Sequence, residues 1–178
     1  MPRLFVGLEV PHDIAMNLER LRGGLPGARW IDTQNYHITL RFIGDIDNGR
    51  ANDVADMLAR VRRRGFKLWL DGLGAFGGHK PHTLFARIKP LPELTALQME
   101  TEQIIQRAGL PPEGRKFTPH VTLARLRDTS ERAVAEYLSI RGSYASLPFE
   151  VEQFVLFSSQ PARGGGPYLV EETYPLAA

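Results

Sequence analysis

His-Val-Thr-Leu at residues 120–123 has a near copy earlier in the chain, His-Ile-Thr-Leu at residues 37–40. Both stretches have the period-2 pattern and the β-branched residues that predict a short β-strand. Because residues two apart in a strand share a face, His120 and Thr122 point one way and the two aliphatic side chains point the other. Each strand therefore combines an apolar face for packing with a face that carries an imidazole and a hydroxyl.

The spacing around the two copies repeats as well. Phe66 opens an apolar stretch after His37, and Phe149 opens another at the same distance after His120. A further strand-like stretch follows each of these. Such self-similarity is typical of an internal duplication, here with a unit of about 80 residues. A duplicated fold with a pseudo-twofold axis would bring both His/Thr strands to one cleft.

Hydrophobic periodicity, interrupted by glycine and proline, predicts alternating strands and helices in the rest of the chain. Ser130 is a candidate N-cap, and Gly65 and Gly109 are candidate helix ends. No low-complexity linker separates the halves, so we expect one domain over residues 1–178, made of two pseudo-twofold-related lobes. The expected strands are 4–8, 37–44, 66–73, 83–89, 120–123, 148–157 and 167–174, and the expected helices are 12–22, 51–64, 92–108 and 131–140.

The composition allows a substantial core, since 43% of the 178 residues are hydrophobic and 24% are charged. No apolar run approaches the roughly 20 residues of a transmembrane helix, and the N-terminus lacks the pattern of a signal peptide. Cysteine is absent, which excludes disulfides, thiolate metal sites and a cysteine nucleophile. We therefore expect a cytoplasmic protein, and its net charge of +2 is compatible with a phosphate ligand.

Two histidines that face one cleft can work as an acid and a base. Imidazole has a pKa of about 6.5, so near neutral pH one ring can accept a proton while the other, charged, donates one. The threonine hydroxyls beside them suit the non-bridging oxygens of a phosphate. No carboxylate recurs at matching positions, so the pattern favours metal-free cleavage of a phosphodiester, with a strained cyclic phosphate as the electrophile. The alternative is structural: the His/Thr pairs could hydrogen-bond in a polar seam between the lobes.

Two other polar clusters have competing interpretations. His79 and His82 are three residues apart, but Pro81 between them forbids a helical pair and no third ligand is evident. We therefore expect no metal and no other cofactor. Arginines crowd residues 60–64, where they are either a solvated helix end or a contact for an RNA backbone. We favour the solvated helix end, because charge runs usually do no more than solvate a face.

Both His/Thr stretches resemble the motifs of a known family. Residues 37–44 and 119–125 are similar to the paired His-x-Thr motifs of the 2H phosphoesterases, above all of the bacterial RNA 2′,3′-cyclic phosphodiesterases, also called 2′-5′ RNA ligases. The resemblance covers nearly the whole chain, including residues 3–6, 28–30, 70–76 and 154–159. It implies an α+β fold that is bilobal and duplicated, with two antiparallel sheets and outer helices around a central cleft.

The family implies metal-free hydrolysis of an RNA 2′,3′-cyclic phosphate to a 2′-phosphate, and reversible 2′-5′ ligation in some members. Carried over to this sequence, His37 is the general acid, His120 is the general base, and Thr39 and Thr122 bind the phosphate. The implied partner is RNA with a 2′,3′-cyclic phosphate end, with tRNA fragments among the candidates, and we expect a monomer that does not associate with membranes. Two alternatives stay open, namely the ligation direction and a non-catalytic module that binds RNA ends.

The arginine beside the phosphate is ambiguous. The family resemblance points to Arg125, whereas strand parity turns Arg125 away from the second histidine and favours Arg41, which shares a face with the first. Phe42 and Trp30 are candidates for stacking on a base. Core packing is the competing interpretation for Phe42, because parity places it on the apolar face.

Overall fold

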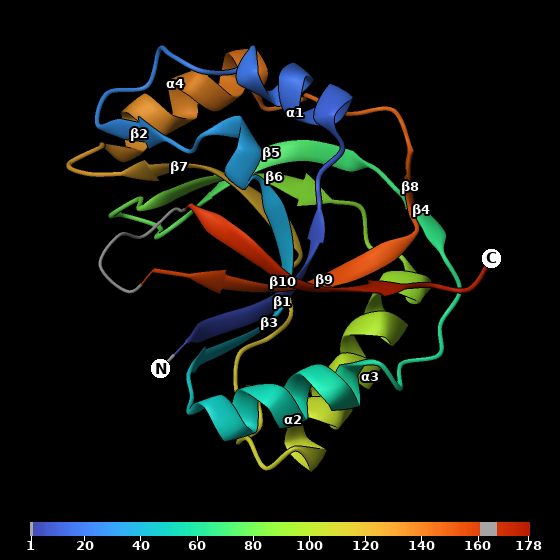
Figure 1. Cartoon of the computed structure of the whole chain (residues 1–178). Coiled ribbons are helices and arrows are strands. Elements are labelled where there is room, and N and C mark those ends of the chain that lie inside the picture. Colours follow the sequence, from blue (N-terminus) through green and yellow to red (C-terminus); the bar gives the residue numbers. More distant parts are fainter. Residues whose placement is uncertain (1, 161–166) are drawn as a thin grey trace.

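Strands and helices alternate along the described part of the chain, residues 2–160 and 167–178, in a computed structural model (Figure 1). The strands are β1 (Arg3–Glu9), β2 (Ala28–Trp30), β3 (His37–Asp45), β4 (Phe66–Leu68), β5 (Leu70–Phe76), β6 (Thr83–Ile88), β7 (His120–Leu126), β8 (Phe149–Val151), β9 (Gln153–Ser159) and β10 (Tyr168–Pro175). The helices are α1 (His12–Glu19), α2 (Asn48–Leu58), α3 (Pro92–Arg107) and α4 (Glu131–Arg141), with a 3₁₀ turn at Thr33–Asn35. Within the described residues, no helix has both the length and the apolar character needed to cross a membrane.

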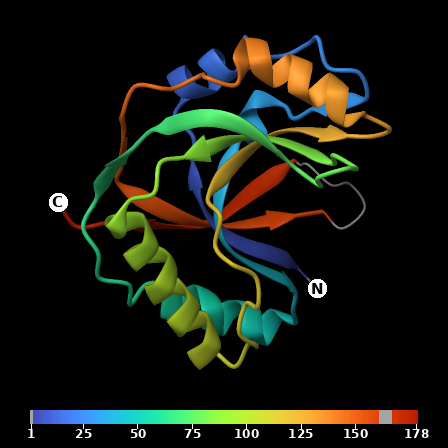
Figure 2. The same cartoon turned by 180° about the vertical axis from the view of Figure 1, so that it is seen from behind.

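The strands form two antiparallel sheets, which confirms the predicted α+β class. The larger sheet has the order β10-β9-β1-β3-β7-β6-β5, with β2 paired to β7, and the smaller sheet consists of β4 and β8. Within the larger sheet, β3 and β7 meet at the pair Ile38–Val121, so the sheet is nearly divided into two lobes at this point. Figures 1 and 2 show α2 and α3 together over the outside of one lobe, and α1 and α4 over the outside of the other.

Elements of the first half recur in the second at a constant distance. In the first half, the starts of β3, α2, β4 and β5 are His37, Asn48, Phe66 and Leu70. In the second half, the starts of β7, α4, β8 and β9 are His120, Glu131, Phe149 and Gln153, with the same intervals between them. Where the halves touch, equivalent positions pair, namely Ile38 with Val121 and Lys67 with Glu150. From these pairs we propose that residues 1–178 form one domain whose halves are related by a pseudo-twofold axis.

The two halves also exchange strands. β6, which follows β5 in the first half, pairs with β7 from the second, while β9 and β10, from the second half, extend the sheet from β1. Each lobe therefore contains strands from both halves. Because an unpaired strand edge leaves backbone polar groups without partners, this exchange ties the two lobes into one folding unit.

The apolar faces of β3 and β7 supply the centre of the core. Ile38, Leu40, Val121 and Leu123 are at most 3% exposed, as the period-2 pattern predicted. Truncating one such side chain to alanine typically costs about 2–5 kcal/mol of stability. The histidine and threonine on the opposite face of each strand stay half-buried. Burial of one face thus fixes the position of the polar groups on the other.

Some helix and strand ends differ from the prediction because capping or pairing intervenes. α2 starts at Asn48 rather than at 51, since the Asp47 side chain accepts a backbone hydrogen bond from the first turn at 2.8 Å. It ends at Leu58 rather than at 64, because the next backbone N–H groups close a tight turn. The predicted strands 66–73 and 148–157 each break in two, because β4 and β8 leave the large sheet to pair with each other.

Candidate active site

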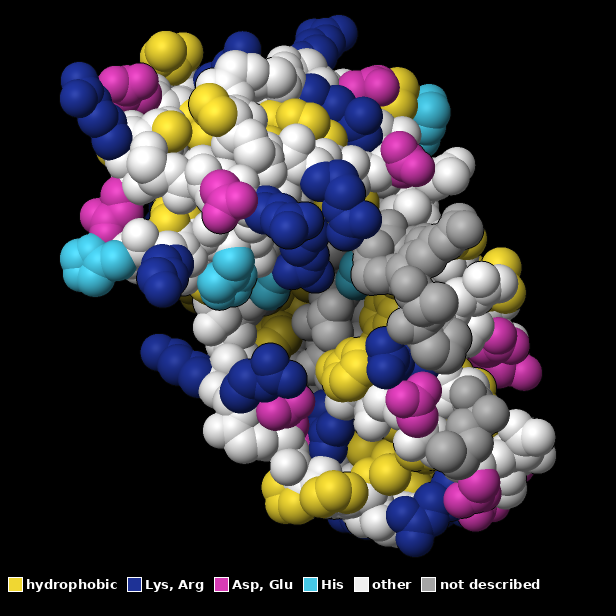
Figure 3. All heavy atoms as spheres, turned by 90° about the vertical axis from the view of Figure 1, so that its left-hand side faces the viewer, with side chains coloured by type: hydrophobic (Ala, Val, Ile, Leu, Met, Phe, Trp, Pro, Cys, Tyr) yellow, Lys and Arg dark blue, Asp and Glu magenta, His cyan; other side chains and the backbone are white. Residues whose placement is uncertain are grey.

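A cavity of about 420 Å³ lies where the two lobes meet, and both His/Thr pairs line it. Figure 3 shows the hollow, with histidine side chains and a cluster of lysine or arginine side chains beside it. Among the described lining residues there is no carboxylate. This volume suits a nucleotide-sized ligand, and the positive charge suits an anion. The charged and imidazole side chains that line the cavity are Arg3, Arg115, Arg125, His37, His82 and His120.

Backbone carbonyl groups orient the two motif histidines. Nδ1 of His37 lies 2.9 Å from the carbonyl oxygen of Asn35, and Nδ1 of His120 lies 2.7 Å from that of Thr118. A carbonyl oxygen can only accept, so each Nδ1 donates, and each neutral ring keeps its lone pair on Nε2. Each carbonyl belongs to the residue two positions before its histidine. The two halves therefore orient their imidazoles by the same local contact.

The four motif side chains share the cavity. Nε2 of His37 lies 3.0 Å from Oγ1 of Thr39, whose hydroxyl donates to the ring when Nε2 carries the lone pair. Thr122 lines the cavity from β7, beside His120. Within the described residues, no hydrogen bond joins the His/Thr side chains of one strand to those of the other. They therefore face an open cavity rather than a closed polar seam.

Aromatic side chains pack against both imidazoles and restrict their rotation. The ring contacts are Phe5, Phe157 and Tyr168 on His37, at centroid distances of 4.8, 5.9 and 4.9 Å, and Phe76 and Phe85 on His120, at 5.0 and 5.5 Å. Several of these contacts are tilted or edge-on, the geometries that aromatic pairs prefer. The rings are therefore preorganised before any ligand arrives.

Burial sets the charge of the two rings. Burial, aided by the nearby positive charges of His120 and Arg125, lowers the pKa of His37 to about 4, against the opposing hydrogen bond to Asn35. Burial also lowers the pKa of His120, and the charge of Arg125 acts in the same direction. Both rings are therefore neutral in the empty cavity near pH 7. A bound anion would favour their charged forms.

Of the two candidate arginines, Arg125 reaches the cavity, and strand parity was wrong about it. β7 contains a bulge: Phe85 of β6 pairs with Thr122 and Leu84 pairs with Ala124, so Leu123 is an extra residue. An extra residue reverses the facing of every side chain beyond it. Arg125, five residues after the histidine, therefore emerges on the same face as the histidine.

Arg41 was expected in the cavity by parity, and this prediction was also wrong. β3 has the equivalent bulge, because Gly7 of β1 pairs with Thr39 and Val6 pairs with Arg41, which leaves Leu40 as the extra residue. Arg41 is consequently 7% exposed and does not line the cavity. It forms an ion pair with Glu102 and donates to the backbone carbonyl groups of Phe42 and Pro111, so its role is structural.

The bulges in β3 and β7 also change the interpretation of the two aromatic candidates, Phe42 and Trp30. Phe42 does not pack in the core: it is 43% exposed and lines the cavity, where a base could stack on it. Trp30 does not line the cavity. Its ring packs against the core and Tyr137, at a centroid distance of 6.1 Å, because β2 pairs with the part of β7 beyond the bulge.

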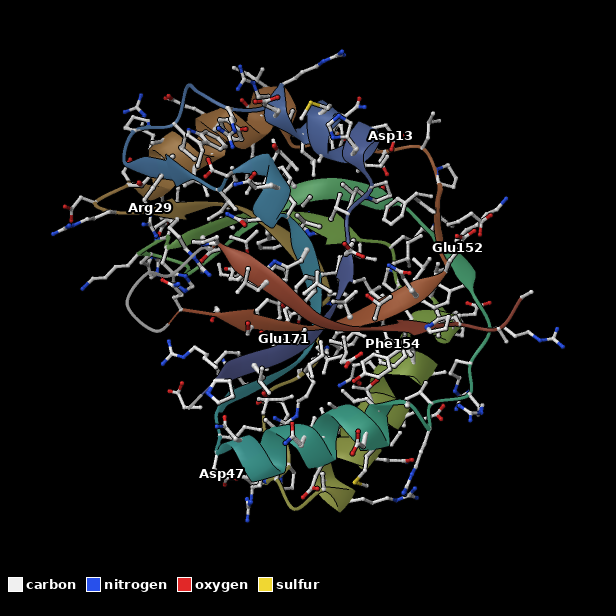
Figure 4. The ribbon with its side chains drawn as sticks, in the orientation of Figure 1. Asp13, Arg29, Asp47, Glu152, Phe154 and Glu171 are labelled. Carbon is white, nitrogen blue, oxygen red and sulfur yellow. The ribbon has the colours of Figure 1, made fainter. Side chains whose placement is uncertain are left out.

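Two further arginines, which the sequence patterns did not predict, line the cavity. Arg3 begins β1, and Arg115 lies in the loop before β7. No local pattern marked either of them, because each reaches the cavity through contacts between distant segments. Each also pairs with a nearby carboxylate, so Arg125 is the cavity arginine with no ion pair in the described chain. Arg29 of β2 is not among the lining residues of the cavity, but it stands opposite Arg125 in the strand register. Figure 4 labels it at the edge beside β7.

The two histidines of the His79–His82 stretch have different surroundings. The side chain of His79 is almost fully exposed and pairs with Glu131. His82 instead lines the cavity, with Nδ1 2.8 Å from Oγ1 of Thr83. In the part of the chain that the structure describes, no group of three or more His, Cys, Asp or Glu side chains could hold a metal ion.

Comparison with known sequences gives a consistent family. The model of the family described as LigT-like phosphoesterase matches residues 8–85 and 88–168. An RNA 2′,3′-cyclic phosphodiesterase of Aeropyrum pernix is 37% identical over 148 residues, which cover 82% of this chain and 84% of the relative. Enzymes of the same name from Aquifex aeolicus and Escherichia coli are each 30% identical, over 98% and 93% of this chain and 97% and 92% of the relatives.

Solved structures agree with the sequence matches. Escherichia coli LigT, crystallised with 3′-AMP, has a TM-score of 0.81 and 26% identity over the full length of both chains. TT0787 of Thermus thermophilus has a TM-score of 0.80 over 97% of both chains, and at 23% identity it shows a common fold. The family model covers most of the sequence, including both His-x-Thr strands. The chain therefore belongs to the LigT-like phosphoesterases, the 2H family that its two motifs resemble.

Proposed function

We propose that this protein is an RNA 2′,3′-cyclic phosphodiesterase that opens the cyclic phosphate to a 2′-phosphate without a metal ion. The observation that carries the proposal is the pair of oriented imidazoles in one cavity that is lined by arginines and, among the described residues, by no carboxylate. The names of the relatives from Aeropyrum pernix and Escherichia coli support the same substrate.

In this mechanism the two rings divide the proton transfers. Neutral His120 accepts a proton from a water molecule as the water oxygen attacks phosphorus. The bond between phosphorus and the 3′ oxygen breaks, and charged His37 donates its proton to that oxygen. The product carries a 2′-phosphate and a 3′-hydroxyl, and the two rings have exchanged their protonation states. Strain in the five-membered cyclic ester lowers the barrier to this step.

Three further side chains stabilise the charge that grows on phosphorus. Thr39 and Thr122 donate hydrogen bonds to the non-bridging oxygens, one from each strand. Arg125 adds a charged donor that no carboxylate neutralises among the described residues. Preorganised donors of this kind contribute more to the transition state than to the ground state, because charge on the oxygens increases as water adds.

The lowered pKa of His37 sets a condition on its role as the acid. In the empty cavity the ring is neutral and cannot donate the proton that the leaving oxygen needs. A bound phosphodiester brings a negative charge beside the ring, which favours the imidazolium and raises the pKa. The acid therefore forms when the substrate is present.

Recognition of RNA follows from the groups around the phosphate. The exposed ring of Phe42 offers a stacking surface for the base next to the cyclic phosphate. The arginines of the cavity suit the phosphates of the adjoining RNA backbone. RNA ends such as those of cleaved tRNA are substrates of this kind.

Incubating the purified protein with a short RNA that ends in a 2′,3′-cyclic phosphate tests the proposal. We expect a 2′-phosphate product, identified by mass spectrometry and by its resistance to a phosphatase specific for 3′-phosphates, at the same rate with and without EDTA. A 3′-phosphate product would place the break at the other ester bond. Loss of activity in EDTA, restored by zinc or manganese, would overturn the metal-free mechanism, and binding without turnover would leave only an RNA-end-binding module. Adding an RNA with a free 5′-hydroxyl reveals any ligation.

A further inference from the structure

Thr83 is a buried hydroxyl in the wall of the cavity that the proposed mechanism does not use. It begins β6, is 2% exposed and lines the cavity. In the register between β6 and β7 it stands opposite Arg125. The backbone pairing of the two strands therefore delivers one polar side chain directly beside the other.

The hydrogen bonds around Thr83 have one consistent direction. Nη1 of Arg125 lies 3.2 Å from Oγ1 of Thr83, and a guanidinium group can only donate, so Thr83 accepts. The hydroxyl keeps its own proton, which it can donate to Nδ1 of His82 at 2.8 Å. Thr83 thus stands between the arginine and the third cavity imidazole, with both of its bonds satisfied.

A neutral anchor suits an arginine that must bind an anion. A carboxylate would hold the guanidinium but would also cancel its charge, as Glu102 does for the buried Arg41. A hydroxyl fixes the direction of the guanidinium and leaves its charge for the ligand. A long side chain that is already fixed loses less conformational freedom when the ligand binds.

We infer that Thr83 is a positioning residue that orients Arg125 toward the phosphate group of the ligand. The inference deepens the proposed function, since it rests on Arg125 as the phosphate-binding arginine. It assigns Thr83 no contact with the reacting atoms. Its effect on the ligand passes through the guanidinium.

Two substitutions at Thr83 separate the hydroxyl from the volume. Thr83→Val keeps the branched shape and removes the hydroxyl, whereas Thr83→Ser keeps the hydroxyl. Inorganic phosphate, titrated into the protein in a calorimeter, reports anion binding without any need for turnover. We expect Thr83→Val to weaken phosphate binding about tenfold, the usual effect of one lost hydrogen bond to a charged group, and Thr83→Ser to stay within about twofold of the wild type. With a 2′,3′-cyclic nucleotide, kcat should fall more than KM rises, because the guanidinium contributes more to the transition state than to the ground state.

The Arg125→Ala background decides between positioning and a general structural effect. There, Thr83→Val should cause no further loss, because the group it orients is gone. Unchanged phosphate binding in Thr83→Val, or an equal loss in the Arg125→Ala background, would overturn the inference. A wild-type protein that does not hydrolyse cyclic phosphates, but whose phosphate binding weakens in Thr83→Val as expected, would overturn the proposed function and leave the inference intact.

The outer helices α2 and α3 border a second, positively charged groove. A groove of about 460 Å³ between the end of α2 and α3 is lined by four arginines, Arg60, Arg62, Arg63 and Arg107, and shares no described lining residue with the cavity. The carboxylate among its described lining residues is Glu100, which pairs with Arg63 at 2.5 Å. Arg60 and Arg107 have no side-chain hydrogen bond or ion pair within the described residues, so their positive charges remain free.

We propose that this groove binds the phosphate backbone of the RNA beyond the end that occupies the cavity. The sequence favoured a solvated helix end for residues 60–64, but the fold adds Arg107 from a different helix. Charges that converge on one groove from the segment after α2 and from the end of α3 suit the closely spaced phosphates of a nucleic acid. The proposal rests on RNA as the substrate.

Charge reversal with a matched control tests the groove. Arg60→Glu/Arg107→Glu should weaken binding of a longer single-stranded RNA about tenfold in fluorescence anisotropy, and should make its dependence on log salt less steep by roughly 1.4, or about 0.7 for each lost phosphate contact. Turnover of a cyclic mononucleotide should not change. The control Arg20→Glu/Arg132→Glu alters net charge equally, on the other lobe. Equal weakening by the control, or unchanged RNA binding in the groove variant, would overturn the proposal, whatever the outcome for hydrolysis.

Discussion

The two His/Thr strands, β3 and β7, share a backbone design but present different side chains. Both orient a histidine through the carbonyl group two residues earlier, and both bulge three residues after the histidine. Beyond the bulge, β3 buries Arg41 and exposes Phe42, whereas the equivalent positions of β7 bury Ala124 and expose Arg125. One strand therefore gives the cavity an apolar ring and the other gives it a charge.

The two histidines also differ in the side chains that surround them. His37 is packed among three aromatic rings, and burial there lowers its pKa to about 4. His120 contacts two rings, and burial lowers its pKa as well. An acid and a base need different environments even in a symmetric site. The proposed duplication accounts for the equivalent backbones, and the proposed division into acid and base rests on the different side chains around the two rings.

Replacing either histidine tests whether both strands are needed. We expect kcat to fall about 10²–10⁴-fold in His37→Ala and in His120→Ala, the usual contribution of one general acid or base, with KM changing less. The losses should not multiply in the double variant if the rings act as a unit. Steady-state kinetics on a 2′,3′-cyclic nucleotide provides the measurement, and a fully active single variant would break the comparison.

A substrate with an activated leaving group at the 3′ position sharpens the division of roles. Such a group needs little protonation as it departs, so it should restore turnover in His37→Ala and leave His120→Ala inactive. Restored turnover in His120→Ala alone would exchange the acid and the base between the strands.

The residues beyond the bulges should affect different parts of the substrate. Arg125→Ala should lower kcat/KM about 10²–10³-fold on every substrate, because it removes a charged donor to the phosphate. Phe42→Ala should lower it about tenfold, and only where a base is present to stack. Comparing a cyclic nucleotide with ribose 2′,3′-cyclic phosphate, which has no base, separates the two. A loss in Phe42→Ala on the base-free substrate would contradict this division.

The two arginines should differ in stability as they differ in burial. Arg41→Ala leaves Glu102 without its ion-pair partner, so we expect a loss of about 3 kcal/mol in the free energy of unfolding and an almost unchanged kcat/KM. Arg125→Ala should show the reverse, with full stability and little activity. Urea unfolding and kinetics on both variants give the test, which fails if Arg41→Ala is stable but inactive.

Acid should destabilise the protein through His37. Because the pKa of His37 falls from 6.5 to about 4 in the native state, the unfolded chain binds this proton more tightly. The resulting stability is fully present above pH 6.5 and is lost as the pH falls from there to about 4, by up to about 3 kcal/mol. Urea unfolding at about pH 7 and about pH 4.5 should show a smaller acid-induced loss in His37→Gln than in the wild type. An equal loss would mean that the native state does not hold this ring neutral.

Features that are local or repeated could be predicted from the amino-acid sequence. A period of two is a property of one extended backbone, so His37 shares a face with Thr39, and His120 with Thr122, whatever the strands pair with. The equal spacing from each histidine to the next apolar stretch predicted a duplication. These patterns identified the four motif residues that line one cavity, and the family resemblance of the same stretches implied the α+β class.

Which further side chains join them in the cavity depends on strand pairing between distant segments. The bulges in β3 and β7 arise where these strands pair with β1 and β6, and nothing within the strands themselves announces them. Parity counted along the sequence therefore chose Arg41 over Arg125 and placed Phe42 in the core. The physical reason is that the alternation of faces holds only while the pairing is uninterrupted. One extra residue in a ladder, set by a partner from elsewhere in the chain, reverses every face beyond it.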